Sequence, residues 1–359
     1  MGWLVTCLTI SGFGQGQKWK FMVFGDSRGT DTTDQINTNI LAELAKAATN
    51  ENPAFVLVPG DLVYAGNTAA FQAWSNIMSP VYQAGISVYP VLGNHDDDSD
   101  PNAFKNFFGP MLPTNGPPGE IGRTYAITRS NVLVLALDTY VNPGRVNTNW
   151  VASVLATNTR PHVFAMGHQP AFKVNHDDCL DDYPANRNAF WNSLSNAHCR
   201  IYFAGHDHFY DHMRLDDGDG DSRNDLHQFI VGTAGAPLSA DSYPYNGDNS
   251  GWTPARVLHE QQYGYVIVEI DGYQATATWH HRVGSNAYAA TAEIFAYDAR
   301  PLIKASYADG RLMMKWSGAA TLQSASELAG TFTDVPGAAP PYTVTNTGSS
   351  AQFYRLRVP

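Results

Sequence analysis

The first 210 residues alternate between short apolar runs and stretches in which apolar residues recur at helical spacing. The apolar runs are rich in β-branched and aromatic residues. They predict buried strands at residues 21–24, 55–58, 88–92, 132–137, 163–166 and 201–204. The intervening stretches predict helices at residues 33–48, 71–83, 150–156 and 186–197. This alternation indicates an α/β fold in which helices cover a layered sheet.

Beyond residue 210, apolar runs at 227–231, 265–270 and 275–281 predict strands that complete the sheet on its second side. We expect this first domain to span residues 18–296. From residue 301 onward, short strands separated by Gly, Pro and Ser predict a small all-β C-terminal module over residues 301–359. Its segments LQSA, FTDVPG, YTVT and FYRLR are similar to β-sandwich modules at the C-termini of secreted bacterial proteins.

Composition narrows the class of protein. The chain has 359 residues, of which 43% are hydrophobic and 15% charged, as expected of a packed globular protein. Its formal net charge of -11 disfavours nonspecific attraction to nucleic acid or to anionic membranes, since both need an excess of Lys and Arg. No apolar run approaches the roughly 18 residues that a membrane span needs. We therefore expect neither a nucleic-acid partner nor a membrane span.

The N-terminal segment and the cysteines bear on location. The apolar stretch 3–10, followed by small residues at 12–16, resembles the end of a signal peptide without its basic start. Residues 1–17 are accordingly predicted to be a signal segment, and the protein to be secreted or periplasmic. If Cys7 is removed with that segment, Cys179 and Cys199 remain. These two either form a disulfide or are small buried thiols.

Five of the apolar runs end directly in clusters of metal-ligand residues, each containing a glycine. The clusters are FGDSRG at 24–29, GDLVY at 60–64, GNHD at 93–96, GHQP at 167–170 and GHDH at 205–208. Because loops at the carboxyl ends of strands in an α/β sheet converge on one crevice, these clusters can meet in space. They supply carboxylate, amide, imidazole and phenol groups, which suit a borderline-hard metal pair rather than a thiolate zinc site.

The order of these motifs resembles the calcineurin-like metallophosphoesterases, and Tyr64 in GDLVY resembles their purple acid phosphatase branch. The resemblance implies a layered α/β/β/α sandwich. It also implies two metal ions, the first ferric iron and the second zinc, manganese or ferrous iron. Asp61 would bridge the two. The other ligands implied are Asp26, Tyr64 and His208 for the first metal, and Asn94, His168 and His206 for the second.

A hydroxide held by two such metals attacks the phosphorus in line with the leaving group. His95, next to the ligand Asn94, would then donate a proton to the leaving alkoxide, or only hydrogen-bond to neighbouring groups. His176 follows His168 by eight residues. It falls near a substrate-facing histidine of the purple acid phosphatases, although the spacing is not a strict match.

Arg28 departs from the resemblance, because this position usually holds His in the superfamily and Gly in the purple branch. A guanidinium has only donors, so Arg28 cannot replace a metal ligand. Two roles remain for it. Arg28 either binds the phosphate bound across the metals, or forms a salt bridge to Asp96 or Asp97.

An acidic stretch at residues 216–225 places carboxylates at alternate positions. Asp217, Asp219, Asp221 and Asp225 could coordinate calcium through oxygen atoms. The EF-hand pattern fails here, since Ser222 and Gln228 stand where its glycine and its final glutamate belong. A solvated hairpin tip is the alternative.

Together, these features predict an enzyme that hydrolyses small phosphate monoesters. A phosphodiesterase or nucleotidase with the same metal centre is the alternative within enzymes. A non-catalytic binding protein would be expected to lack ligands, and all seven are present. The sequence contains no HExxH or Walker motif that would support a different hydrolytic chemistry.

Overall fold

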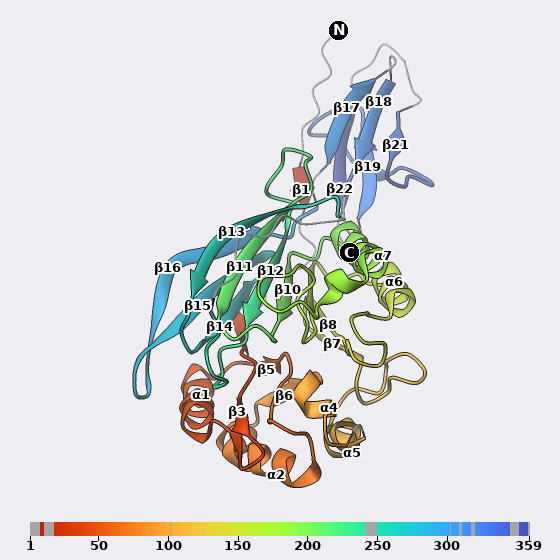
Figure 1. Cartoon of the computed structure of the whole chain (residues 1–359). Coiled ribbons are helices and arrows are strands. Elements are labelled where there is room, and N and C mark those ends of the chain that lie inside the picture. The colour runs from red at the N-terminus through yellow and green to blue at the C-terminus, as the bar shows by residue number, and fades with distance from the viewer. Residues whose placement is uncertain are drawn as a thin grey trace.

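Two β-sheets packed face to face form the centre of the structure (Figure 1). The computed structural model describes residues 8–10, 18–100, 102–240, 250–301, 303–308, 311–316, 320–344 and 352–357. The first sheet has the order β16 (Ala287–Asp298), β15 (Gln274–Gly284), β14 (Gly264–Asp271), β2 (Trp19–Val23), β5 (Phe55–Val58) and β6 (Ser87–Pro90). The second has the order β13 (Thr253–Glu260), β11 (Tyr210–Asp216), β12 (Leu226–Val231), β10 (Ile201–Ala204), β9 (His162–Met166), β8 (Val132–Ala136) and β7 (Tyr125–Arg129).

Helices cover the outer faces of both sheets, which confirms the α/β/β/α layering. The first sheet carries α1 (Thr38–Glu51), α2 (Thr68–Ile77), α3 (Ser79–Gln83) and α5 (Ala103–Phe108), whose buried residues join its core, and the short α4 (Asn94–Asp97) follows β6. The second carries α6 (Thr148–Ala156) and α7 (Pro184–Asn196). Strands β2, β5 and β6 run parallel, as do β8, β9, β10 and β12. Their carboxyl ends therefore bring distant loops together.

The main hydrophobic core lies between the sheets. The ring of Phe21 stacks on Phe55 within its own sheet, with centroids 5.0 Å apart. It meets Phe164 of the opposite sheet edge-on at 5.1 Å. Every residue of β5 and β8 is buried, which explains why these strands are continuously apolar in sequence. A second cluster fills the space between the seven-stranded sheet and helices α6 and α7.

Two predicted helices differ from the observed ones. The helix predicted at 33–48 begins only at Thr38, because the side chain of Asn37 caps it by accepting from the Ile40 amide. The residues before it form a hairpin of β3 (Arg28–Asp31) and β4 (Asp34–Ile36). The helix predicted at 71–83 is two helices, α2 and α3, that meet at Met78. Pro80 lies in the first turn of α3, a position that tolerates its missing amide hydrogen.

The C-terminal region is rich in strands, as predicted. One sheet has the order β1 (Leu8–Ile10), β22 (Phe353–Arg357), β19 (Thr321–Ala325) and β20 (Thr333–Asp334); a second joins β17 (Lys304–Ala308), β18 (Arg311–Lys315) and β21 (Tyr342–Thr343). These strands enclose a hydrophobic cluster of their own around Met314 and Leu322. Residues 1–7 and 11–17 lie outside the described residues, so the signal segment stays a prediction.

The proposed disulfide is wrong for this structure, in which Cys179 and Cys199 are both free thiols. Each side chain is buried, and the Cys199 thiol donates to the carbonyl of Ile201 at 3.3 Å. Burial raises the pKa of Cys199 to about 12 and that of Cys179 further still. The alternative of two small core thiols is therefore the one observed.

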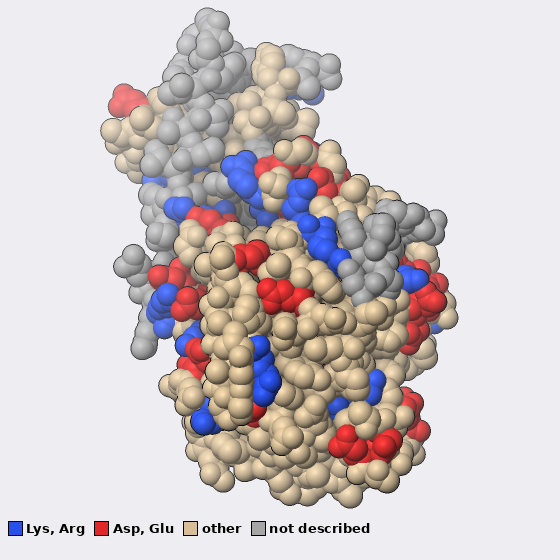
Figure 2. Space-filling model, turned by 60° about the vertical axis from the view of Figure 1, so that its left-hand side comes forward, with Lys and Arg blue, Asp and Glu red and all other residues tan. Residues whose placement is uncertain are grey.

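Charge is dispersed over the surface that Figure 2 draws. Acidic and basic side chains lie scattered there among a majority of uncharged residues. The excess of carboxylates is thus not gathered into one acidic area on this face. Among the residues that the structure describes, no helix combines the length and apolar character needed to cross a bilayer.

Candidate metal centre

The five predicted ligand clusters follow strands β2, β5, β6, β9 and β10 directly, and their loops meet at one end of the two sheets. Asp26, Asp61 and His206 have φ angles of 62°, 52° and 72°, in the left-handed region that most residues avoid. Tight backbone contacts hold them. The Asp26 amide donates to the Gly60 carbonyl at 3.0 Å, and a side chain at Gly205 would collide with the Asp26 carboxylate.

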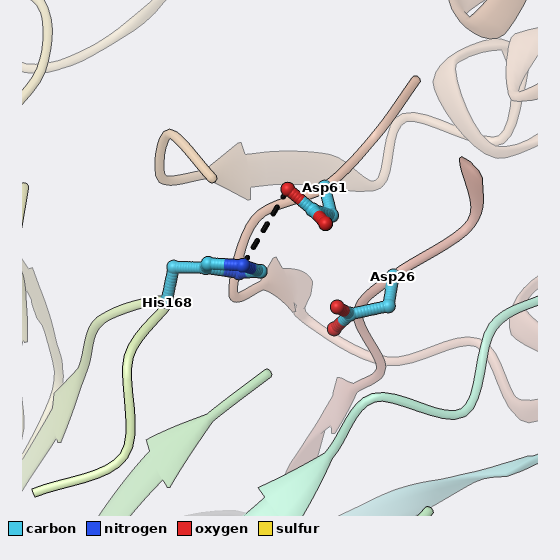
Figure 3. Close-up of side chains that lie close together, drawn as sticks. All are labelled: Asp26, Asp61 and His168. Atoms are coloured by element: carbon cyan, nitrogen blue, oxygen red, sulfur yellow. Dashed lines mark ion pairs between the residues drawn. The ribbon is translucent and has the colours of Figure 1, made fainter. Parts of the chain in front are cut away.

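Two carboxylates form the middle of the site. Asp26, Asp61 and His168 each offer a ligand atom, and these atoms lie within 4.8 Å of one another (Figure 3). Both aspartates are almost fully buried. Burial and the nearby Asp61 raise the pKa of Asp26 well above its usual value. One oxygen of each, Asp26 Oδ2 and Asp61 Oδ2, accepts no hydrogen bond from any described residue. Such a pair is costly to bury without cations, so these residues fit a metal site.

Two imidazoles flank the carboxylates. His168 donates from Nδ1 to the Pro59 carbonyl at 2.8 Å, which leaves its Nε2 3.4 Å from Asp61 Oδ1. His208 donates from Nδ1 to the Pro237 carbonyl at 2.9 Å, and its Nε2 lies 3.6 Å from Asp26 Oδ1. Burial lowers the pKa of His168 to about 4, and burial together with Arg28 lowers that of His208 to about 3. Both rings are neutral at pH 7 and can donate a lone pair to a metal.

Asn94, the first residue of α4, joins the imidazoles. Its Oδ1 lies 3.0 Å from His168 Nε2 and 3.2 Å from His206 Nδ1. The site therefore has two ends. Asp26 and His208 lie at one end, Asn94 with His168 and His206 at the other, and Asp61 contacts the second group while lying beside Asp26.

Comparison with known proteins agrees with this geometry. Residues 20–210 match the model of the calcineurin-like phosphoesterase family. The chain belongs to this family. The match supports hydrolysis of phosphate esters, and the group Asp26, Asp61 and His168 could hold a metal ion. No curated protein has significant sequence similarity to the chain.

Several solved structures share the phosphoesterase fold. Purple acid phosphatase PPD1 from yellow lupin (Lupinus luteus) seeds matches with a TM-score of 0.62 at 14% identity, over 79% of this chain and 54% of that one. This chain thus corresponds to about half the length of the lupin protein. GAP50, the anchor in the inner membrane complex of Plasmodium, matches with a TM-score of 0.55 at 15% identity, over 78% and 89% of the two chains. PhoD matches with a TM-score of 0.55 at 13% identity, over 83% and 73%. At these identities the likeness shows the fold alone.

Tyr64 and His95 lie side by side in this phosphoesterase, with ring centroids 4.9 Å apart. His95 donates from Nδ1 to the Tyr64 carbonyl at 2.8 Å, so its Nε2 remains for another partner. The His95 amide donates to Asp61 Oδ1 at 3.1 Å. His95 is therefore fixed beside the candidate ligands. The Tyr64 hydroxyl as a ligand stays a prediction.

Arg28 faces the centre rather than the salt-bridge partners considered from the sequence. Its Nε lies 3.5 Å from Asp61 Oδ2, and its guanidinium carbon is 5.7 Å from the centroid of the Tyr64 ring. Asp96 instead accepts from the amides of the loop after β5 and from the Gly93 amide. Asp97 pairs with Arg123 at 3.5 Å. The tethering role predicted for Arg28 at Asp96 or Asp97 is wrong, because other donors fill that place.

His176 lies against the opposite side of the centre. Its ring centroid is 4.6 Å from that of His206 and 6.1 Å from that of His208. Its Nδ1 donates to Asp207 Oδ1 at 2.6 Å, and this hydrogen bond raises the pKa of His176. The side chain is 38% exposed, so it can meet both the centre and solvent.

Three residues of the site were missed from the sequence. Asp207, between two candidate ligands, is fully buried and accepts from the amides of residues 175 and 176. Asp178 Oδ1 lies 3.0 Å from His206 Nε2. The Tyr140 hydroxyl lies 3.5 Å from Asn94 Oδ1. Two of them had a usable signal: Asp207 lies within the cluster at 205–208, and Tyr140 closely follows the apolar run at 132–137.

The acidic loop gathers a different set from the predicted one. Asp216, Asp217 and Asp225 place carboxylate oxygens within 4.8 Å of one another. Asp219 accepts from the Asp221 amide, and Asp221 pairs with Arg223 at 2.7 Å. Calcium binding by this loop stays a prediction.

Proposed function

We propose that this phosphoesterase hydrolyses phosphate monoesters at a dinuclear metal centre. The observation that carries the proposal is the pair of buried aspartates, Asp26 and Asp61, each with an oxygen that accepts no hydrogen bond from the described residues. Neutral imidazoles stand on both sides of this pair. Two buried carboxylates stay ionised together only when cations balance their charge; otherwise one takes up a proton, as the raised pKa of Asp26 indicates.

The contacts support a division of ligands between two cations. Asp26 and His208 would hold one of them, with Tyr64 completing its shell if the phenol ligates. Asn94, His168 and His206 would hold the other, and Asp61 would be shared. We propose ferric iron for the first position and zinc, manganese or ferrous iron for the second.

The chain's own residues would orient the substrate and move the proton. When bound, the two cations supply positive charge for the phosphate and lower the pKa of the attacking water. Arg28, held beside Asp61 and Tyr64, would pair with a phosphate oxygen. His95 has its Nδ1 engaged and would protonate the leaving alkoxide from Nε2. His176 would hydrogen-bond to the ester from the opposite side.

Steady-state kinetics on the metal-loaded protein test this proposal. We expect turnover of p-nitrophenyl phosphate to exceed that of bis(p-nitrophenyl) phosphate. Asp61→Asn keeps the size of the side chain and tolerates the left-handed backbone, but removes the charge. The substitution should lower kcat/KM by more than the roughly hundredfold loss typical when a residue that hydrogen-bonds to a metal ligand is replaced. The control Asp177→Asn, at a side chain 90% exposed, should behave as wild type.

Two results would contradict the proposal. Faster turnover of the bis-ester would indicate the phosphodiesterase alternative. A metal-loaded protein that turns over neither ester would indicate a binding protein.

A further inference from the structure

The two ring nitrogens of His206 face different surroundings. Nδ1 points into the centre, 3.2 Å from Asn94 Oδ1 and 3.2 Å from His168 Nε2. Nε2 points outward and lies 3.0 Å from Asp178 Oδ1. The His206 side chain is 6% exposed and that of Asp178 is 60% exposed, so the carboxylate lies on the solvent side of the imidazole.

We infer that Asp178 is a positioning residue that keeps the proton of His206 on Nε2 and leaves the Nδ1 lone pair for a metal. The inference rests on the dinuclear centre proposed above. Both nitrogens face an oxygen that only accepts, Asn94 Oδ1 at 3.2 Å from Nδ1 and Asp178 Oδ1 at 3.0 Å from Nε2. The charged carboxylate forms the stronger hydrogen bond, so it holds the hydrogen on Nε2. The same contact orients the ring and strengthens the opposite nitrogen as a ligand.

The other two imidazoles of the centre are held differently. His168 and His208 each donate from Nδ1 to a backbone carbonyl, of Pro59 and Pro237, and present Nε2. His206 presents the opposite nitrogen, and its outer partner carries a full charge. A neutral carbonyl is fixed by the fold, whereas a side-chain carboxylate can be removed by one substitution. Asp178 is therefore a site at which one ligand can be weakened without altering any ligand.

The segment that carries Asp178 is anchored to the same ligand turn. The amides of Asn175 and His176 donate to the Asp207 carboxylate at 3.1 and 3.0 Å. The carbonyl of Asp178 accepts from Gln169 Nε2 at 2.8 Å, and Gln169 directly follows a ligand. These bonds join the segment to both loops that supply imidazoles. The carboxylate is thus placed by the backbone.

Nitrogen-15 NMR of the histidine rings in metal-free protein tests the tautomer. Wild-type His206 should carry its proton on Nε2. Asp178→Asn retains an accepting oxygen and should keep this tautomer, whereas Asp178→Ala should give a mixture or the Nδ1-protonated form. The neighbouring Asp177→Ala is the matched control, because Asp177 is 90% exposed and pairs with Lys173. It should leave the His206 signals unchanged.

Zinc titration by calorimetry tests the consequence. Asp178→Ala should weaken one of two zinc equivalents by roughly ten- to a hundredfold and leave the other unchanged. Asp178→Asn should show a smaller loss of the same equivalent, and Asp177→Ala none.

An unchanged His206 tautomer in Asp178→Ala would overturn the inference, as would equal weakening of both equivalents or of neither. If wild type binds fewer than two zinc ions, the proposed dinuclear centre fails. The tautomer measurement on metal-free protein still decides the role of Asp178.

Discussion

Replacing Arg28 by alanine should lower kcat/KM on a phosphate monoester by ten- to a hundredfold while the metal content stays the same. The side chain is 14% exposed, and its Nε lies 3.5 Å from Asp61 Oδ2 without the geometry of a hydrogen bond. Two unit charges at this separation attract by about 5 kcal/mol at an effective dielectric constant of about 20. Desolvation offsets much of this attraction. A hydrogen bond from Arg28 to a charged group such as the bound phosphate has a net worth of about 1.5–3 kcal/mol.

This range converts to the predicted loss, because about 1.4 kcal/mol corresponds to a factor of ten in kcat/KM. Loss of the guanidinium also removes positive charge beside Asp61. The affinity for metal should therefore stay the same or increase, since Arg28 no longer competes for that carboxylate. Arg28→Lys keeps the charge without the planar fork and should give an intermediate rate.

The assay combines initial rates on p-nitrophenyl phosphate with elemental analysis of the same preparation. Full activity in Arg28→Ala would refute a role in binding substrate. Loss of activity in proportion to loss of metal would show that Arg28 supports the centre and not the phosphate.

Three further predictions concern colour, thiols and pH. Ferric iron bound by a phenolate absorbs in the visible, so the iron-loaded wild-type protein should be purple or pink. Tyr64→Phe should lose this absorption band. A colourless wild-type protein with stoichiometric iron would exclude Tyr64 as a ligand. Thiol titration in denaturant without reductant should detect both Cys179 and Cys199. These two thiols should react slowly or not at all in the native protein, since both are buried. If either thiol is missing after unfolding, the result contradicts the structure. Burial lowers the pKa of His162 from 6.5 to about 4, so the unfolded chain binds this proton more readily and stability should fall as pH drops from about 6.5 to about 4. In urea unfolding, the stability of His162→Gln should depend less on pH over this window than that of wild type. If the two depend equally on pH, other groups cause the dependence.

The ligand clusters could be predicted from the sequence because each follows an apolar strand directly. A parallel strand fixes where its carboxyl end lies, so Asp26, Asp61 and His168 are brought together by the sheets and not by details of loop packing. Strand β5 was predicted with the observed bounds, because it is buried on both faces and its apolar run ends where Pro59 and Gly60 follow the strand.

Other features depended on contacts that local patterns do not contain. The start of α1 was misplaced because the Thr-rich segment before it forms a hairpin, in which Asp31 accepts from the Thr33 and Asp34 amides. Asp178 was missed because its partner, His206, lies 28 residues away on another loop. The disulfide was wrong because two cysteines that flank a helix in sequence need not approach each other in space.

The left-handed backbone at Asp26 and Asp61 limits which residues can occupy these positions, whatever the protein does. Aspartate, asparagine and glycine adopt this conformation at low cost, and most other residues do not. A descendant of this chain that no longer bound metal would still be restricted to these three residue types by the conformation of the turn. Retention of Asp at 26 and 61 among relatives would then report the path of the main chain. Retention of His208, whose backbone is under no such constraint, would report continued selection for the metal.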